Sequence, residues 1–423
     1  MLKKVLFGAV CAGLLQTQGF SQDVKKWAFY GYFVGDDKTA SLETSQVRDI
    51  IELKNGLRAN NAHVVVQHDR SDKTNSTLKS FYHDPNYSGV SRYEIGLDGI
   101  SSVKKIGEKN MGDAQTFFNF LDWSMQNYPA ENVVLTVNAH GSGILSWSGP
   151  TSVRDNKSYD DVNLDTNPFD PFVGYDHTGD SLTIIEFKRV LEEIKTKYPQ
   201  SKIRVIIFDA CLSEGVEVMS DLKDVTDVVI GSATTIPGTG MDYKAVTQAM
   251  TSNVDEVVLA KHVAEAFIDS VGNNNLISVY HLGSMHVFEQ KLDAFSDALI
   301  NAMDTHHKKG IRGLRNYTDN YWDIYSIASS IRSGNSDLGS DSTLVNAATE
   351  MMIAQKEMNL VTWTKGDWKG TMGLSIFWPD RDTYKKYRDF YKKLSFSKNH
   401  RWDEFLDRFI LNKRPAIFDQ LYK

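Results

Sequence analysis

The sequence is poor in cysteine, since its 423 residues contain two, Cys11 and Cys211. It also has no excess of positive charge: 47 Lys and Arg against 54 Asp and Glu give a formal net charge of −7, which argues against a nucleic-acid-binding protein. Beyond the N-terminus no stretch has the length and apolarity of a transmembrane helix. The chain contains no internal repeat and no low-complexity tract. What remains is a globular protein with enough residues for one large α/β domain and a smaller one.

The first 21 residues have the layout of a secretory signal. Lys3 and Lys4 precede an apolar stretch from Val5 to Leu15, and small residues stand three and one positions before a cut after Ser21. The apolar stretch is too short to cross a bilayer. Cys11 would leave with the signal, and lipid attachment at Cys11 is the less favoured alternative. We therefore expect an exported protein, periplasmic or extracellular, that keeps a single thiol.

The remaining thiol, Cys211, comes shortly after a segment that has the pattern of a buried strand. Val205 to Phe208 is a continuous apolar run, typical of a strand covered on both faces of a parallel sheet, and it stops at Asp209. Ligands of open α/β sheets bind at the carboxyl ends of the strands, and the start of the following helix would lower the pKa of a thiol there. A free cysteine is more often a small buried hydrophobe. A lone thiol in an oxidising compartment has no intramolecular disulfide partner, however, and this favours Cys211 as a nucleophile.

A histidine stands at the end of a second predicted strand. Residues 132–138 read NVVLTVN and lead directly to His140, which is followed by Gly141 and Gly143. Glycines allow a ligand to approach the backbone closely. A lone histidine in this place would more often be structural. Because a lone cysteine follows a later strand in the same way, the pair favours nucleophilic catalysis with His140 as the acid–base partner of Cys211.

With these residues the chain resembles the clostripain family of cysteine peptidases, in the clan that includes caspases, gingipains and legumain. The resemblance covers most of residues 27 to 412. It implies a caspase-like αβα sandwich with a mostly parallel central sheet, plus a helix-rich C-terminal region. The expected division is a signal peptide (1–21), a caspase-like peptidase domain (22–284) and the C-terminal region (285–423). The similar segments are Asn127 to Ala130, His140-Gly141, Asp209 to Leu212, Val216 to Val218, Leu222 to Val225, Pro237 to Gly240 and Gly373 to Ile376.

The resemblance also implies the roles of individual residues in a secreted cysteine endopeptidase. Cys211 would attack the scissile carbonyl as a thiolate, and His140 would protonate the departing amine. The backbone N–H groups of Gly141 and Cys211 would hold the oxyanion. Asp209 would line the S1 pocket and pair with Lys or Arg before the cut, although an aspartate there could instead cap the next helix. Substrates would be proteins or peptides with such residues, and the enzyme would be a monomer.

The stretch 144–180 is long, acidic and rich in turn-forming residues, and relatives often mature by cutting themselves there. Arg154 and Lys157 are the candidate sites, Arg154 first, unless both are simply solvated charges. No cofactor is expected to be required and no metal ligand is assigned. Some relatives respond to Ca²⁺, and aspartates of this stretch could bind it, but they lack the spacing of a calcium loop, so a solvated acidic loop is favoured. These aspartates are Asp155, Asp160, Asp161, Asp165, Asp170 and Asp176.

One segment departs from the family pattern. Relatives commonly have acidic residues where this chain reads Ser232-Ala233-Thr234-Thr235. The departure leaves open a second hypothesis, a catalytically inactive binding protein with the caspase fold. A carboxylate-pair glycosidase, suggested by the many aspartates and tryptophans, has no supporting motif.

Overall fold

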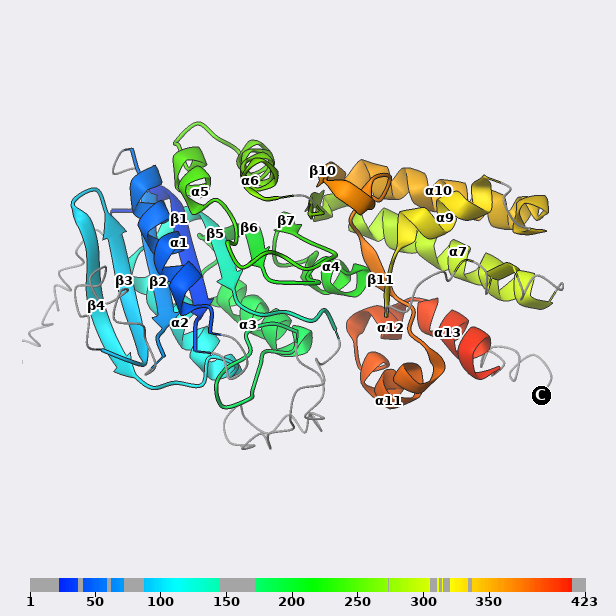
Figure 1. The fold of residues 1–423 in the computed structure, drawn as a ribbon, viewed down its shortest axis with the longest axis horizontal. Helices are drawn as coiled ribbons and strands as arrows, with labels where there is room; N and C mark the ends of the chain where they lie inside the picture. Colours follow the sequence, from blue (N-terminus) through cyan, green and yellow to red (C-terminus); the bar gives the residue numbers. More distant parts are fainter. Residues whose placement is uncertain are drawn as a thin grey trace, which may run out of the picture.

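A nine-stranded sheet forms the centre of the molecule, with the strand order β10-β8-β7-β6-β5-β1-β2-β3-β4 (Figure 1). In this computed structural model the described residues are 23–36, 41–58, 62–71, 87–144, 172–272, 274–304, 310–311, 314, 320–333 and 337–412. The strands are β1 (Lys25–Val34), β2 (Ala62–Asp69), β3 (Val90–Gly96), β4 (Gly99–Gly107), β5 (Ala130–Asn138), β6 (Lys202–Asp209), β7 (Val228–Gly231), β8 (Leu276–His281) and β10 (Asn359–Thr364). A separate two-stranded sheet pairs β9 (Tyr321–Asp323) with β11 (Ser375–Phe377).

Five neighbouring strands, from β2 through β1, β5 and β6 to β7, run parallel, and the outer pairs are antiparallel. The apolar runs of β1, β5 and β6 explain this arrangement, because strands covered on both faces are apolar throughout. Alternate side chains of β1 enter two different cores: Tyr30 and Tyr32 lie in one, Phe29 and Phe33 in the other.

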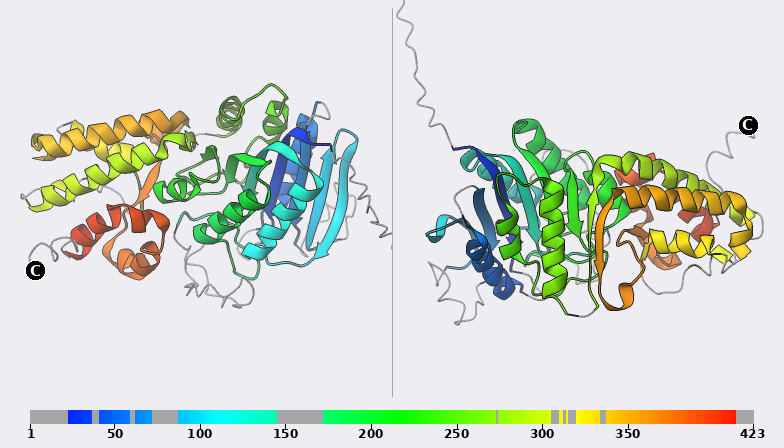
Figure 2. Two further views of the ribbon diagram at one scale, coloured as in Figure 1. Left: turned by 180° about the vertical axis from the view of Figure 1, so that it is seen from behind. Right: turned by 90° about the horizontal axis from the view of Figure 1, so that it is seen from above.

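Helices cover both faces of the sheet (Figures 1 and 2). The core with Tyr30 and Tyr32 includes side chains of α2 (Ala114–Asn127), α3 (Ile184–Lys197) and α4 (Val216–Leu222). The opposite core includes side chains of α1 (Glu43–Gly56), α5 (Tyr243–Ala249) and α6 (Glu256–Ser270). The caspase-like αβα sandwich with a mostly parallel sheet, expected from the sequence, is confirmed.

The C-terminal region is mainly helical, and one of its strands joins the central sheet. Helix α7 (Met285–Asp304) begins this region, and the later strand β10 pairs antiparallel with β8. Helices α7 and α10 (Ser342–Met358) pack along each other (Figure 1). The other α-helices of this region are α9 (Ile324–Arg332), α11 (Arg381–Tyr391), α12 (Ser395–Asn399) and α13 (Trp402–Leu411).

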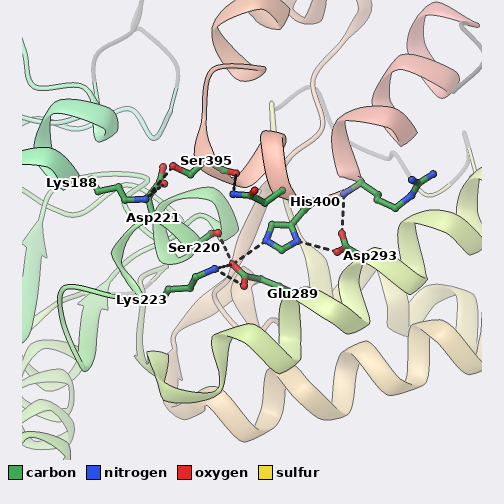
Figure 3. A network of polar contacts seen from close by, with 10 residues as sticks. Lys188, Ser220, Asp221, Lys223, Glu289, Asp293, Ser395 and His400 are labelled. Carbon is green, nitrogen blue, oxygen red and sulfur yellow. Dashed lines mark hydrogen bonds and ion pairs between the residues drawn. The ribbon is translucent and has the colours of Figure 1, made fainter. Parts of the chain in front are cut away.

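Polar contacts tie this region to the sheet domain (Figure 3). Glu289 of α7 accepts hydrogen bonds from Ser220 of α4 at 2.5 Å and from Lys223 at 2.7 Å. The ring of His400 lies 3.4 Å from the same carboxylate and 3.0 Å from Asp293. The two regions therefore share a charged network in addition to β10.

No helix among the described residues has both the length and the apolar character needed to cross a membrane. The signal peptide expected in residues 1–21 lies outside the described residues.

Candidate active site

The ends of β5 and β6 bring the predicted catalytic pair to one edge of the sheet. Asn138 lies opposite Asp209 in the parallel register, and the Ala139 N–H donates to the Asp209 carbonyl at 3.2 Å. His140 and Cys211 follow at this edge, and both line one cavity of about 570 Å³. This volume is in the range of sites for small molecules and short peptide segments.

Gly141 packs directly on the backbone of the cysteine. A Cβ atom at this position would lie 2.5 Å from the Cys211 carbonyl oxygen and 3.3 Å from the Cys211 nitrogen. Real side chains do not approach a backbone oxygen so closely, so this position requires glycine. The glycine that the sequence placed after His140 therefore lets the two strand ends come together.

The thiol of Cys211 is half-buried and accepts a hydrogen bond from the Ile236 N–H at 3.3 Å. Burial raises the pKa of this thiol, the Ile236 N–H lowers it, and the nearby Asp209 carboxylate raises it further. The expectation that a helix N-terminus lowers the thiol pKa is wrong. The following helix, α4, begins only at Val216, and burial dominates instead.

A left-handed residue follows the cysteine. Leu212 has φ of 56°, and its N–H donates to the Thr234 carbonyl at 2.9 Å. A non-glycine residue in this conformation costs of order 1 kcal/mol and is kept only where neighbouring contacts impose it. The Glu214 N–H donates to the Ser232 carbonyl at 3.3 Å. These two hydrogen bonds fix the turn that carries Cys211 against the loop after β7.

The C-terminal region, for which the sequence indicated no chemistry, supplies a wall of the cavity. The Tyr321 hydroxyl donates to the Ser142 carbonyl at 3.2 Å, directly after the His140-Gly141 pair. Asp323 is a carboxylate of the lining, and it accepts the N–H groups of Met372 and Gly373 at 3.1 and 3.0 Å. Similarity to the family over Gly373 to Ile376 was the one available signal. The lining from this region comprises Asn320, Tyr321, Asp323, Trp368, Thr371, Gly373 and Ser375.

Asp209, the predicted S1 residue, is not among the residues that line the cavity. Its carboxylate is buried and accepts hydrogen bonds from Tyr243 at 2.9 Å, Asn138 at 3.1 Å and the Met241 N–H at 3.1 Å. Asn138 also donates to Asp49 at 2.8 Å. Burial raises the pKa of Asp209 to about 6, although the bonds from Met241 and Tyr243 lower it. The alternative role of Asp209, capping the next helix, is wrong, because Gly215 is the N-cap of that helix and no side chain caps it.

Several predicted residues of the loop lie outside the described residues. These are the self-cleavage candidates Arg154 and Lys157 and all the candidate calcium-binding aspartates before Asp176. Asp176 is described, and it accepts the Met111 N–H at 2.9 Å. Its carboxylate lies 3.2 Å from His177 Nδ1, beside a cluster of Asp69, Glu108 and His177 that is separate from the residues that line the cavity.

Comparisons with known proteins agree with this geometry. A sequence profile described as the Clostripain family matches residues 31–409. Clostripain of Hathewaya histolytica is 26% identical over 421 residues, covering 84% of this chain and 75% of that protein.

Two solved structures share the fold. A secreted C11 cysteine protease from Bacteroides thetaiotaomicron, bound to an irreversible peptide inhibitor, is similar with a TM-score of 0.60 and 18% identity, covering 88% of this chain and 99% of that one. An inactive zymogen C11 protease from Parabacteroides distasonis has a TM-score of 0.57 and 16% identity, covering 89% and 98%. This chain therefore belongs to the clostripain family and is a cysteine endopeptidase.

Proposed function

We propose that this peptidase is exported, cleaves after Lys or Arg with a dyad of Cys211 and His140, and matures by cutting itself between residues 144 and 180. The observation that carries the proposal is the meeting of His140 and Cys211 in one cavity, with Gly141 packed on the cysteine backbone.

The dyad would work through an acyl-enzyme. Because the pKa of the Cys211 thiol is raised, the resting thiol keeps its proton, and His140 removes it as the sulfur attacks the scissile carbonyl. His140 then gives this proton to the departing amine, and water releases the acyl group.

Two backbone N–H groups would stabilise the oxyanion, those of Gly141 and Cys211. The neighbouring amides are already used, since the Ser142 N–H donates to the Phe172 carbonyl at 3.3 Å and the Leu212 N–H to Thr234. Replacing the glycine would therefore affect both the fit to the cysteine and the site of charge stabilisation.

We assign the preference for a basic residue to Asp209. It is buried beside a second carboxylate, Asp49, and Asn138 donates to both. A cation brought by a substrate would compensate these charges. The segment from Ile236 to Met241 contacts Cys211 at its start and Asp209 at its end, so an outward shift of this segment would open a path between the cavity and Asp209.

Maturation by self-cleavage is supported by where the loop begins and ends. Gly141, next to His140, forms a bridge with Val173, and the Gly174 N–H donates to the His140 carbonyl at 3.1 Å. A cut between these two chain segments would release the ends that flank the histidine. The similar zymogen from P. distasonis and the secreted protease from B. thetaiotaomicron agree with maturation and export.

The test compares the full chain with a Cys211→Ala variant on a denaturing gel and in assays with fluorogenic peptides ending in Lys, Arg, Asp or Asn. We expect the parent to split near Arg154 or Lys157 and to cleave only the basic peptides, and the variant to do neither. If both proteins stay intact and inactive, with and without reductant, the dyad proposal fails.

Two matched variants test the specificity residue. Asp209→Asn should lose cleavage after Lys and Arg, whereas Asp323→Asn, which changes a carboxylate of the cavity wall, should keep it. The opposite result would transfer the role to Asp323 and refute the assignment of Asp209.

A further inference from the structure

A cluster of potential metal ligands lies at the same edge of the sheet as the active site but is built from other strands. Asp69 ends β2, Glu108 directly follows β4, and His177 lies in a turn before α3. One ligand atom from each of the three lies within 4.8 Å of the others. Ligands that are each about 2.0–2.5 Å from a shared ion are separated by distances up to this size.

Asp69 is the member that ordinary protein contacts do not explain. Its side chain is 0% exposed, and neither carboxylate oxygen has a hydrogen-bond partner among the described residues. A buried carboxylate without a hydrogen bond or a counter-charge is costly, so native proteins pair such groups or use them to bind metals. The adjacent cation Arg70 points its Nε to Glu43, at 3.2 Å.

His177 presents its ring to the same place. Its Nδ1 is buried and makes no hydrogen bond with the described residues. Carboxylate oxygens of Asp176, Glu108 and Asp36 lie 3.2, 3.7 and 4.0 Å from it. An imidazole nitrogen among carboxylate oxygens is a ligand set for a divalent cation, with Asp36 and Asp176 able to complete or support it.

We propose that Asp69, Glu108 and His177 bind one divalent transition-metal ion, Zn²⁺ or Mn²⁺, at a structural site outside the catalytic cavity. The imidazole favours these ions over Ca²⁺ and Mg²⁺, which prefer sets of oxygen ligands. The proposal does not depend on the dyad or on the preference for basic residues.

The ion would fasten the chain that follows the 145–171 segment to the sheet. His177 is three residues after Gly174, whose N–H donates to the His140 carbonyl, and four after Val173, which bridges Gly141. A metal that holds His177 to Asp69 and Glu108 therefore also holds the segment that packs on the histidine end of β5.

The experiment uses the full chain with Cys211→Ala, because a thiolate would itself bind Zn²⁺. The chelator-treated protein is titrated with Zn²⁺, Mn²⁺, Ca²⁺ and Mg²⁺ by calorimetry, and its melting temperature is measured with each ion. Asp69→Asn and His177→Gln are made in the same background. Glu131→Gln, which changes an exposed carboxylate at the start of β5, is the control.

We expect one Zn²⁺ or Mn²⁺ per chain and a higher melting temperature with the ion. Binding should be more than about tenfold weaker in Asp69→Asn and His177→Gln, and unchanged in Glu131→Gln. In chelator, Asp69→Asn should melt no lower than its parent, because an amide costs less to bury than an unpaired carboxylate.

Three results would overturn the proposal: no uptake of Zn²⁺ or Mn²⁺ by the parent, uptake that survives both ligand substitutions, or uptake of Ca²⁺ alone that does not depend on His177. If Asp69→Asn does not fold, His177→Gln and Glu108→Gln decide the matter, since both positions are at least partly exposed.

Discussion

Replacement of His400 should remove a pH-dependent part of the stability of this protein. The ring of His400 is 11% exposed and lies between Asp293 and Glu289, in the network that joins α7 to the start of α13 (Figure 3). Burial alone would lower its pKa, but the hydrogen bonds to Asp293 and Glu289 raise it to about 9. The ordinary value is 6.5, so folding favours the charged ring.

The sign and size of the effect follow from this shift. Because the folded pKa of His400 is raised, its contribution is fully present below about pH 6.5 and is lost as the pH rises through about 9. The difference between a folded pKa of about 9 and the ordinary 6.5 corresponds to at most about 3 kcal/mol. Solvent at this partly buried position reduces it, and we expect about 1–3 kcal/mol.

The assay is urea unfolding of the Cys211→Ala protein at pH 6.5 and pH 9.5, with and without His400→Gln. The parent should lose about 1–3 kcal/mol more free energy of unfolding between these pH values than the variant does. His262→Gln, at an exposed position of α6, is the control and should behave as the parent. Equal losses in the parent and in His400→Gln would refute the raised pKa and the role given to the network.

Two further predictions concern the active site. Gly141→Ala should lower kcat/KM by about 100-fold or more, because the new Cβ would lie 2.5 Å from the Cys211 carbonyl oxygen. The control Gly238→Ala should keep full activity, because no atom lies within 4 Å of its new Cβ. Equal activities of the two variants would contradict the close fit of Gly141 to the cysteine. Because burial raises the pKa of the Cys211 thiol, the rate of alkylation by iodoacetamide should keep rising to a pH above the ordinary value of 9.0. A plateau well below that pH would mean that the thiolate is already formed at rest.

The sheet could be predicted from the sequence where burial imposes a pattern. The apolar runs of β1, β5 and β6 are buried on both faces and stand out from the helices between them. The edge strands β4 and β10 are largely exposed or half-buried and carry polar residues, so no such pattern marks them. Edge strands owe their place to pairing with a neighbour, and single-sequence patterns do not show that pairing.

The active site likewise contains residues that could be predicted from the sequence and residues that could not. His140 and Cys211 could be placed at one sheet edge because each directly follows a strand, and parallel strands end at a common edge. Tyr321 and Asp323 could not be placed at the site from the sequence, because they reach the cavity through the packing of a distant C-terminal strand. The thiol pKa was mispredicted for a related reason, since burial of the thiol outweighs the effect of a helix that begins at Val216, beyond the turn that carries Cys211.

Asp209 illustrates a cost in stability that a functional role would explain. The folded pKa of Asp209, about 6, is raised above its ordinary 3.8, so stability falls as the pH rises through this interval and stays lower above it. Asp209→Asn removes the buried charge and still offers one oxygen to the three donors that Asp209 accepts, Asn138, Met241 and Tyr243. We therefore expect this variant to melt higher than its parent at pH 8, when both are compared in the Cys211→Ala background.

Asp209→Ala is the informative control, because it removes the charge and the acceptor together. It leaves the Met241 N–H and the Tyr243 hydroxyl without their acceptor, whereas Asn138 still donates to Asp49. Each of the two unpaired donors costs about 1–3 kcal/mol, so this variant should melt lower than the parent. In the active enzyme Asp209→Asn should lose cleavage after Lys and Arg while its fold becomes more stable. A variant that is less stable and still cleaves after basic residues would show that Asp209 is a structural residue. The preference for a basic side chain would then have to come from Asp323, the carboxylate residue that lines the cavity.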